Sequence, residues 1–262
     1  MEKLRIRLGF YKHIAIRPAY NLQRTDFFLS SRMKNLIILH GALGAKSQFE
    51  QLIPKLTPHF NIHTLDFDGH GSKSNMEEEF SIELFAQNLK DFLQQNEIHR
   101  PLIFGYSMGG YVALKLESFE ANTFEKVVTL GTKFDWNPES SEKEAGMLNA
   151  EKIEEKVPAF ANYLKSLHGE NEWKAVLQKT AKMMLTLGKK PSLRPYDFHH
   201  IQIPVQLLRG SEDTMVTKKE TVNVQELLAN ANYKEIPDWV HPINQVSPEE
   251  LAQELLSLYL PG

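Results

Sequence analysis

The sequence predicts an α/β fold built on a mostly parallel, doubly wound sheet, with a helical segment inserted into it. Two observations lead to this prediction. Apolar runs of strand length recur along the chain, and they are continuous rather than alternating, as strands buried on both faces of a sheet require. The segments between them carry the 3.6-residue spacing of amphipathic helices, and strands that alternate with helices pair in parallel.

Six runs have the length and composition of buried strands. They are Asn35–Leu39, Asn61–Asp66, Pro101–Phe104, Lys126–Leu130, Val205–Leu208 and Tyr233–Ile236. Apolar residues at helical spacing predict a helix over Ile82–Leu93 and a shorter one over Phe49–Leu56. In a parallel sheet the carboxyl ends of neighbouring strands meet at one edge, so we expect the functional residues in the loops at that edge.

The alternation of strands and helices stops between residues 134 and 200. This charged stretch has no clear strand and shows helical patterns over Glu151–Val157 and Glu172–Leu187, the second of which we expect to end at Gly188. We interpret 134–200 as a helical lid, because it begins directly after a strand end at the functional edge. A helical excursion without function is the alternative. The core then comprises 33–133 and 201–262, and residues 1–32 form an N-terminal extension or a leading hairpin.

Composition argues against several classes of function. Charged residues make up 24% of the chain and the net charge is −3, so nothing indicates a nucleic-acid partner. The absence of cysteine excludes disulfides, a thiol nucleophile and thiolate metal sites, and it suits a reducing compartment. No apolar run has the length of a membrane span, and no signal-peptide core is visible. We therefore expect a cytoplasmic protein that has no membrane partner.

A G-x-S-x-G motif lies between the third strand and a helical pattern. Gly105-Tyr106-Ser107-Met108-Gly109 follows the run Pro101–Phe104 and precedes an apolar segment that starts at Tyr111. A strand, a tight turn and a helix in this order are typical of a nucleophile elbow, in which small neighbours allow a strained serine backbone. The helix N-terminus then lies beside the hydroxyl, where it stabilises an oxyanion. We expect Ser107 to be a catalytic nucleophile.

A serine nucleophile needs a general base and a carboxylate that orients the base. Asp213 comes shortly after the run Val205–Leu208, and His241 comes shortly after the run that ends at Ile236. Both are therefore expected in loops at the carboxyl edge of the sheet. The chain order of nucleophile, acid and histidine is the one associated with the α/β-hydrolase arrangement.

Other acidic and imidazole side chains are weaker candidates. Glu212 adjoins Asp213, but the spacing of Asp213 from the strand end suits an inward carboxylate better. Asp238 is expected to stabilise a turn after a proline. The pair His199-His200 has no metal-ligand spacing to other residues, so we interpret it as structural or rim-forming.

Two backbone N–H groups are expected to bind the oxyanion of an acyl-transfer reaction. One belongs to Met108, directly after the nucleophile. The other is expected from Ala42, in the loop His40-Gly41-Ala42-Leu43-Gly44 after the first strand. We expect His40 to brace this loop by a hydrogen bond rather than to take part in catalysis directly.

The segment from Asp66 to Ser74 contains two aspartates, a histidine and two glycines. A metal site would use Asp66, Asp68 and His70 as ligands. The glycines instead indicate a tight turn whose backbone the acids and Ser72 stabilise, and no second ligand cluster supports a metal. We therefore predict no metal site.

Together these motifs resemble the α/β-hydrolase superfamily from about Met33 onward. The matching elements are His40-Gly41 with Gly44, Asp66-x-x-Gly69-His70-Gly71-x-x-Ser74, Gly105-x-Ser107-x-Gly109, Gly210-x-x-Asp213 and His241-Pro242. Asp68 departs from the pattern, because a proline or arginine often stands there. The resemblance implies an α/β-hydrolase core with a small helical cap, as in esterases, lactonases, thioesterases and C–C bond hydrolases.

On this resemblance we expect a serine hydrolase that converts a small ester-like substrate through an acyl-enzyme intermediate, without a cofactor, as a monomer or homodimer. Large apolar side chains are candidates for an acyl pocket, among them Leu43, Trp136, Trp173 and Met184. Large apolar side chains at helical spacing in the insertion can instead form the core that holds its helices together.

Two alternatives remain open at this point. One is a lyase resembling the menaquinone-pathway enzyme, or a C–C bond hydrolase, with the same triad. Sites of that kind favour arginines that bind a polyanionic substrate, and the insertion offers Arg194, with Lys189 and Lys190 nearby, but no arginine cluster. The other is a non-catalytic ligand-binding protein on the same fold.

Overall fold

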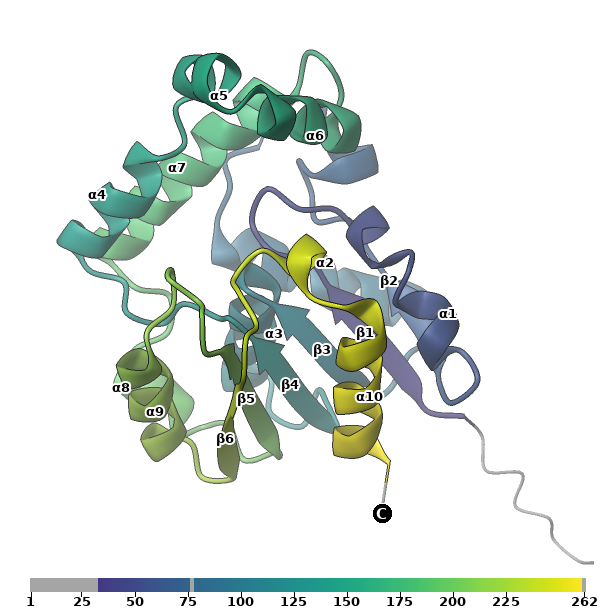
Figure 1. Ribbon diagram of the computed structural model, residues 1–262. Helices are drawn as coiled ribbons and strands as arrows, with labels where there is room; N and C mark the ends of the chain where they lie inside the picture. Colours follow the sequence, from purple (N-terminus) through teal and green to yellow (C-terminus); the bar gives the residue numbers. More distant parts are fainter. Residues whose placement is uncertain (1–32, 76–77, 261–262) are drawn as a thin grey trace, which may run out of the picture. The chain divides into compact units, whose positions relative to one another are not determined.

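A computed structural model describes residues 33–75 and 78–260, so the predicted extension or hairpin over residues 1–32 lies outside the described residues. Within the described part, the strands form one parallel sheet in the order β2-β1-β3-β4-β5-β6 (Figure 1). The strands are β1 (Asn35–Leu39), β2 (Asn61–Thr64), β3 (Leu102–Tyr106), β4 (Lys126–Leu130), β5 (Val205–Gly210) and β6 (Ala231–Ile236). The predicted α/β fold with a parallel sheet is confirmed.

The strand order reverses beside β1, which pairs with both β2 and β3. Leu36 lies opposite Ile62 in β2 and opposite Leu102 in β3. The chain runs outward from β1 to β2, returns to β3 on the other side and then continues outward to β6. Loops that leave the carboxyl ends on either side of such a switch point form a crevice, the usual binding place in open α/β sheets.

Helices cover both faces of the sheet (Figure 1). They are α1 (Ile53–Leu56), α2 (Ile82–Gln95), α3 (Met108–Phe119), α9 (Lys218–Leu227) and α10 (Pro248–Tyr259). Successive strand residues point to opposite faces. Ile37 therefore packs in one apolar cluster with Phe85 of α2, whereas Ile38 packs in the other with Leu255 of α10. Burial on both faces explains why the strands read as continuous apolar runs.

The short helix expected over Phe49–Leu56 is interrupted. The structure has a 3-10 turn at Lys46–Phe49 and then α1, which begins at Ile53. The reason is Pro54, which has no backbone N–H and fits only the first turn of a helix. The apolar spacing was read correctly, but the single helix was wrong.

Five helices lie between β4 and β5; the first four stand over the carboxyl ends of the strands in Figure 1, and the fifth lies beside α9 at the side of the sheet. They are α4 (Pro138–Gly146), α5 (Ala150–Lys156), α6 (Pro158–His168), α7 (Trp173–Lys189) and α8 (Pro195–Phe198). The helix was expected to stop at Gly188, but α7 includes this glycine and ends one residue later, at Lys189. A Cβ at Gly188 would clash with the Ser141 hydroxyl, so glycine is needed there for close packing of α7 against α4.

Among the described residues, no helix is long and apolar enough to cross a membrane.

Replacing Gly105 with alanine is expected to destabilise the fold by about 1–3 kcal/mol, because the strand and the following helix touch there. A Cβ at Gly105 would lie 2.5 Å from both the Cα and the N of Gly110 in α3. The matched control is Gly146→Ala, whose Cβ would have nothing within 4 Å. Urea unfolding of both variants measures the difference, and equal stabilities would contradict this view of the strand–helix contact.

Candidate active site

Ser107 lies in a strained turn between β3 and α3. Its backbone has φ 49° and ψ −116°, which places a non-glycine residue in a region that costs about 1–3 kcal/mol. The last residue of β4 and the segment directly after it hold this turn. The Ser107 N–H donates to the Leu130 carbonyl at 2.8 Å, and the Thr132 hydroxyl donates to the Ser107 carbonyl at 2.9 Å. The turn therefore fixes the Ser107 side chain at the carboxyl edge of the sheet.

The structure brings Ser107, His241 and Asp213 together. The Ser107 Oγ lies 3.3 Å from the His241 Nε2, and the His241 Nδ1 lies 2.8 Å from the Asp213 Oδ2. Each residue follows a different strand, namely β3, β6 and β5. A hydrogen on Nδ1 donates to the carboxylate, so the lone pair of Nε2 faces the serine hydroxyl as a hydrogen-bond acceptor.

Asp213 is held as a carboxylate by its surroundings. Burial alone would raise its pKa, but the hydrogen bond and charge of His241 and the N–H groups of Val216 and Met215 lower the pKa below its usual value. Both N–H groups donate to Oδ1 at 2.8 Å, which leaves Oδ2 for the imidazole. The alternative carboxylate, Glu212, instead accepts from the Ser211 hydroxyl.

Two neighbours fix the positions of the acid and the histidine. Arg209, which is buried at the end of β5, donates to the carbonyls of Asp213 at 2.8 Å and Val216 at 2.7 Å. Gly131, at the end of β4, has φ 60°, and a Cβ there would lie 3.2 Å from both the Asp213 Oδ2 and the His241 Nδ1. Sequence reasoning missed both residues, although their places at strand ends were available as a signal.

Ala42 and Met108, the residues expected to supply the oxyanion donors, are neighbours of Ser107. Both residues line the same cavity as Ser107, and no hydrogen bond among the described residues uses either N–H. The loop that carries Ala42 lies against the serine, since a Cβ at Gly41 would be 3.1 Å from the Ser107 Cβ. Met108 begins α3, so its N–H lies at the positive end of the helix dipole.

His40 connects the loops after β1 and β2. Its Nδ1 donates to the Gly41 carbonyl at 2.8 Å, and its Nε2 accepts from the Phe67 N–H at 3.1 Å. Burial lowers the pKa of His40 to about 4, so the ring is neutral at pH 7. Both ring nitrogens are occupied, as the expected bracing contact requires.

The carboxylates after β2 stabilise a turn. Asp66 accepts from the Lys46 N–H at 2.8 Å and from the Ser72 N–H and hydroxyl at 3.1 and 2.8 Å. Asp68 pairs with Lys73 at 2.9 Å and accepts from the side chain of Asn88. These contacts occupy the oxygens that a metal site would need. Across 33–75 and 78–260, no group of three or more histidine or acidic side chains is placed to hold a metal ion.

His168 joins the helical insertion to the core. It is buried at the end of α6, its Nδ1 accepts from the Gly71 N–H at 3.0 Å, and its Nε2 lies 3.0 Å from the Leu43 carbonyl. Burial lowers its pKa, which favours the neutral ring that this pair of contacts needs. The residue thereby fixes the insertion against the loops after β1 and β2. Sequence reasoning missed it, because a lone histidine carries no signal of its partners.

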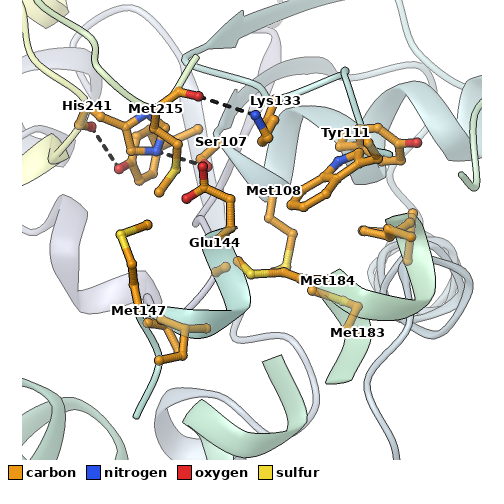
Figure 2. Close-up of a pocket in the computed structure, with 17 residues that line it drawn as sticks. Ser107, Met108, Tyr111, Lys133, Glu144, Met147, Met183, Met184, Met215 and His241 are labelled. Carbon is orange, nitrogen blue, oxygen red and sulfur yellow. Dashed lines mark hydrogen bonds between the residues drawn. The ribbon is translucent and has the colours of Figure 1, made fainter. Parts of the chain in front are cut away.

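A cavity of about 150 Å³ opens at Ser107 (Figure 2). Its apolar wall is rich in methionine, a flexible side chain that adapts to ligands of different shape. The methionines are Met108, Met147, Met183, Met184 and Met215.

Three of the four predicted substrate contacts line this cavity, namely Leu43, Trp136 and Met184. The fourth, Trp173, does not. It is buried among residues of the insertion itself, including Leu164 and Leu177, because it begins α7 on the side that packs against α5 and α6. We therefore correct this assignment, and Trp173 is part of the core of the insertion.

Two charged side chains in the cavity were not predicted, Lys133 after β4 and Glu144 on α4. The cations considered for a polyanionic substrate lie elsewhere. Arg194 and Lys190 line a separate hollow beside Lys115, and Arg194 is paired with Asp197 at 3.2 Å. Lys133 is thus the one lysine or arginine among the described residues that line the Ser107 cavity.

A parallel sheet with a serine elbow and a histidine–carboxylate pair at its carboxyl edge defines a class of protein, the α/β hydrolases. The model of the family described as alpha/beta hydrolase fold matches residues 34–171, more than half of the chain. The chain belongs to this family, and the predicted resemblance is confirmed.

Two of the three matches to curated relatives described here cover only about a third of each chain. The chain is 39% identical over 85 residues to a Haemophilus influenzae protein named "Putative 2-succinyl-6-hydroxy-2,4-cyclohexadiene-1-carboxylate synthase", covering 31% of this chain and 33% of that protein. It is 31% identical over 101 residues to the pimeloyl-[acyl-carrier protein] methyl ester esterase of Vibrio vulnificus, covering 37% and 36%. These matches span about a third of each relative. A longer match, 23% identical over 86% of this chain and 78% of the relative, is to the sn-1-specific diacylglycerol lipase ABHD11 of Danio rerio.

Solved structures share the fold. The enol-lactonase of Burkholderia xenovorans LB400 superposes with a TM-score of 0.70 at 18% identity, covering 86% of this chain and 90% of that one. The crystal structure of E-2-(acetamidomethylene)succinate hydrolase also gives a TM-score of 0.70, at 16% identity, covering 86% of this chain and 90% of that one. At these identities the likeness concerns the fold alone.

Proposed function

We propose that this protein is a serine hydrolase that cleaves a small ester-like substrate through an acyl-enzyme intermediate. The observation that carries the proposal is the hydrogen-bonded series from Ser107 through His241 to Asp213 at the mouth of the cavity. The family membership and the esterase, lipase and lactonase names among the relatives support it.

The proposed reaction has two halves. The His241 Nε2 takes the proton of Ser107 as the Oγ attacks the ester carbonyl, and the N–H groups of Ala42 and Met108 hold the oxyanion. His241 then gives the proton to the leaving alcohol. In the second half, His241 activates a water that attacks the acyl-enzyme, releases the acid and restores the Ser107 hydroxyl. Asp213 holds the imidazole tautomer and stabilises its positive charge.

The helical insertion serves as the cap of this site in the proposal. It supplies Trp136 and Met184 to the cavity wall, and His168 fixes it to the loop that carries Ala42. A cavity of about 150 Å³ holds a group of roughly the size of benzene. The substrate is therefore expected to place a short acyl or alkyl group there.

The alternative is lyase or C–C bond cleavage with the same triad, which the name of the Haemophilus influenzae relative favours. A polyanionic substrate needs several cations to replace its hydration. The described lining offers Lys133 alone, and Glu144 in the same cavity repels anions. The charge of the cavity therefore supports the esterase proposal over this alternative.

The proposed function predicts hydrolysis of p-nitrophenyl esters with a preference for short acyl groups. We expect kcat/KM to be highest between acetate and hexanoate and to fall by about tenfold or more at decanoate, because the longer chain exceeds the cavity. Initial rates across the series, measured from nitrophenolate release, provide the test. An optimum at decanoate or beyond would contradict the proposed size of the substrate, and hydrolysis of none of the esters would contradict the proposed function.

A further inference from the structure

Glu144 is a buried carboxyl group in the wall of the Ser107 cavity, and one of its oxygens has no hydrogen-bond partner among the described residues. Its side chain extends from α4 into the cavity (Figure 2), and the residue is only 3% exposed. The Oε2 atom accepts no hydrogen bond in the part of the chain that the structure describes. Burying such an oxygen without a donor is costly, and a group of this kind in a native protein calls for an explanation, of which a bound ligand is one.

The position of Glu144 is fixed by close helix packing. Ser141 and Glu144 are three residues apart, so they share one face of α4. This face packs against α7 at Gly188, where the absence of a side chain leaves room for the Ser141 hydroxyl. The carboxyl group therefore faces the cavity from a rigid element rather than from a mobile loop.

Lys133 does not neutralise Glu144. No ion pair joins the two side chains, both of which the structure describes. Lys133 is instead directed to Glu220, 3.8 Å away, and to the Met215 carbonyl at 3.4 Å. An ammonium group has three N–H donors, so one remains for a further acceptor. The cavity wall thus contains two charged groups that can bind a ligand. The Oε2 atom of Glu144 on α4 is an acceptor without a donor, and Lys133 after β4 has an N–H that can donate to a further acceptor.

These two charges select the chemistry of a ligand. A carboxylate in the cavity would be repelled by Glu144, and an ammonium group that paired with Glu144 would be repelled by Lys133 in the same cavity. An alkyl group would leave the Oε2 of Glu144 without a donor. A neutral hydroxyl group donates to Glu144 and keeps lone pairs that suit Lys133.

We infer that Glu144 is a specificity-determining residue that selects ester substrates bearing a hydroxyl group near the scissile carbonyl, such as short hydroxyacyl esters. This inference rests on the proposed function, because it assigns the substrate of the same site. The nearby position of the hydroxyl follows from the small cavity that Glu144 shares with Ser107.

The test compares pairs of esters in which a hydroxyl replaces a methyl group of similar size. The pairs are p-nitrophenyl lactate with 2-methylpropanoate and p-nitrophenyl 3-hydroxybutanoate with 3-methylbutanoate. For at least one pair, we expect the wild type to favour the hydroxylated ester by about tenfold or more in kcat/KM. Glu144→Gln retains an acceptor oxygen and keeps part of the preference. Glu144→Met has a similar shape but no acceptor, so we expect the ratio of kcat/KM between the hydroxylated and the methyl ester to fall to about one, whatever the absolute rate of either ester.

A merely structural role of Glu144 would lower the rates of both esters together and leave their ratio unchanged. An unchanged ratio in Glu144→Met, or a wild-type enzyme that favours the methyl ester in both pairs, would overturn the inference. If the wild type hydrolyses no ester, the proposed function fails, and the inference is tested by binding instead. Calorimetry then measures the binding of methyl 3-hydroxybutanoate and methyl 3-methylbutanoate to Ser107→Ala and to the double variant that also carries Glu144→Met. Preference for the hydroxylated ligand that disappears with Glu144→Met supports it, and equal binding of the two ligands overturns it.

Discussion

Replacing Ser107 with alanine is expected to lower kcat for short p-nitrophenyl esters by about four to six orders of magnitude, as for other triad serines. The proposed covalent step needs the Oγ, and no other hydroxyl is placed beside the His241 Nε2 among the described contacts. Stability should change little, because the main-chain hydrogen bonds to Leu130 and Thr132 remain. Steady-state rates and a thermal melt of the purified variant measure both effects.

The control for this variant is Ser257→Ala on α10. Its hydroxyl donates to the Glu254 carbonyl on an exposed helix face far along the chain from the proposed site. We expect full activity from it. Turnover by Ser107→Ala within about tenfold of wild type would exclude the acyl-enzyme mechanism, since general triad behaviour allows only a small residual rate.

The second large effect is expected from Asp213→Asn, which should lower kcat by about three to four orders of magnitude. The Oδ1 position still accepts from the N–H groups of Met215 and Val216, so the loop keeps its conformation. The new amide donates at the Oδ2 position and favours the imidazole tautomer with hydrogen on Nε2. His241 then has no lone pair facing Ser107 and does not act as a base.

The loss in Asp213→Asn should persist at every pH above about 5. The pKa of Asp213 lies below its ordinary value of 3.8, so the wild-type carboxylate is fully ionised throughout this range. The neighbouring Glu212→Gln provides the control, because Glu212 contacts the Ser211 hydroxyl and not the imidazole. Rates of Asp213→Asn that equal those of the wild type across this pH range would assign the orienting role to another group.

Sequence reasoning predicted the sheet and the residues at its edge because both depend on local patterns. A strand buried on two faces must be apolar throughout, which placed β1 and β4 at their observed bounds. Parallel pairing then brings strand ends together, so Ser107, Asp213 and His241 were expected to meet although they are far apart in the chain.

Contacts that depend on packing between helices were not predictable in this way. Trp173 and Met184 are both large apolar residues of α7, yet only Met184 reaches the cavity, and the choice depends on how the helix is rotated against α5 and α6. Gly188 looked like a helix end because the close approach of Ser141 from α4 is invisible in the sequence. The sequence also could not show that the Oε2 of Glu144 has no hydrogen-bond partner, because this depends on which groups surround it in the folded cavity.

The most direct test of the account is covalent labelling of Ser107 by a small alkyl fluorophosphonate, followed by intact-mass and peptide mass spectrometry. If Ser107 is activated and the N–H groups of Ala42 and Met108 bind an oxyanion as proposed, the reagent should give one adduct, located on Ser107. Labelling should be absent in Ser107→Ala and strongly slowed in Asp213→Asn. No adduct on the wild type, or an adduct on a different residue, would contradict the claim that Ser107 is the nucleophile of this protein.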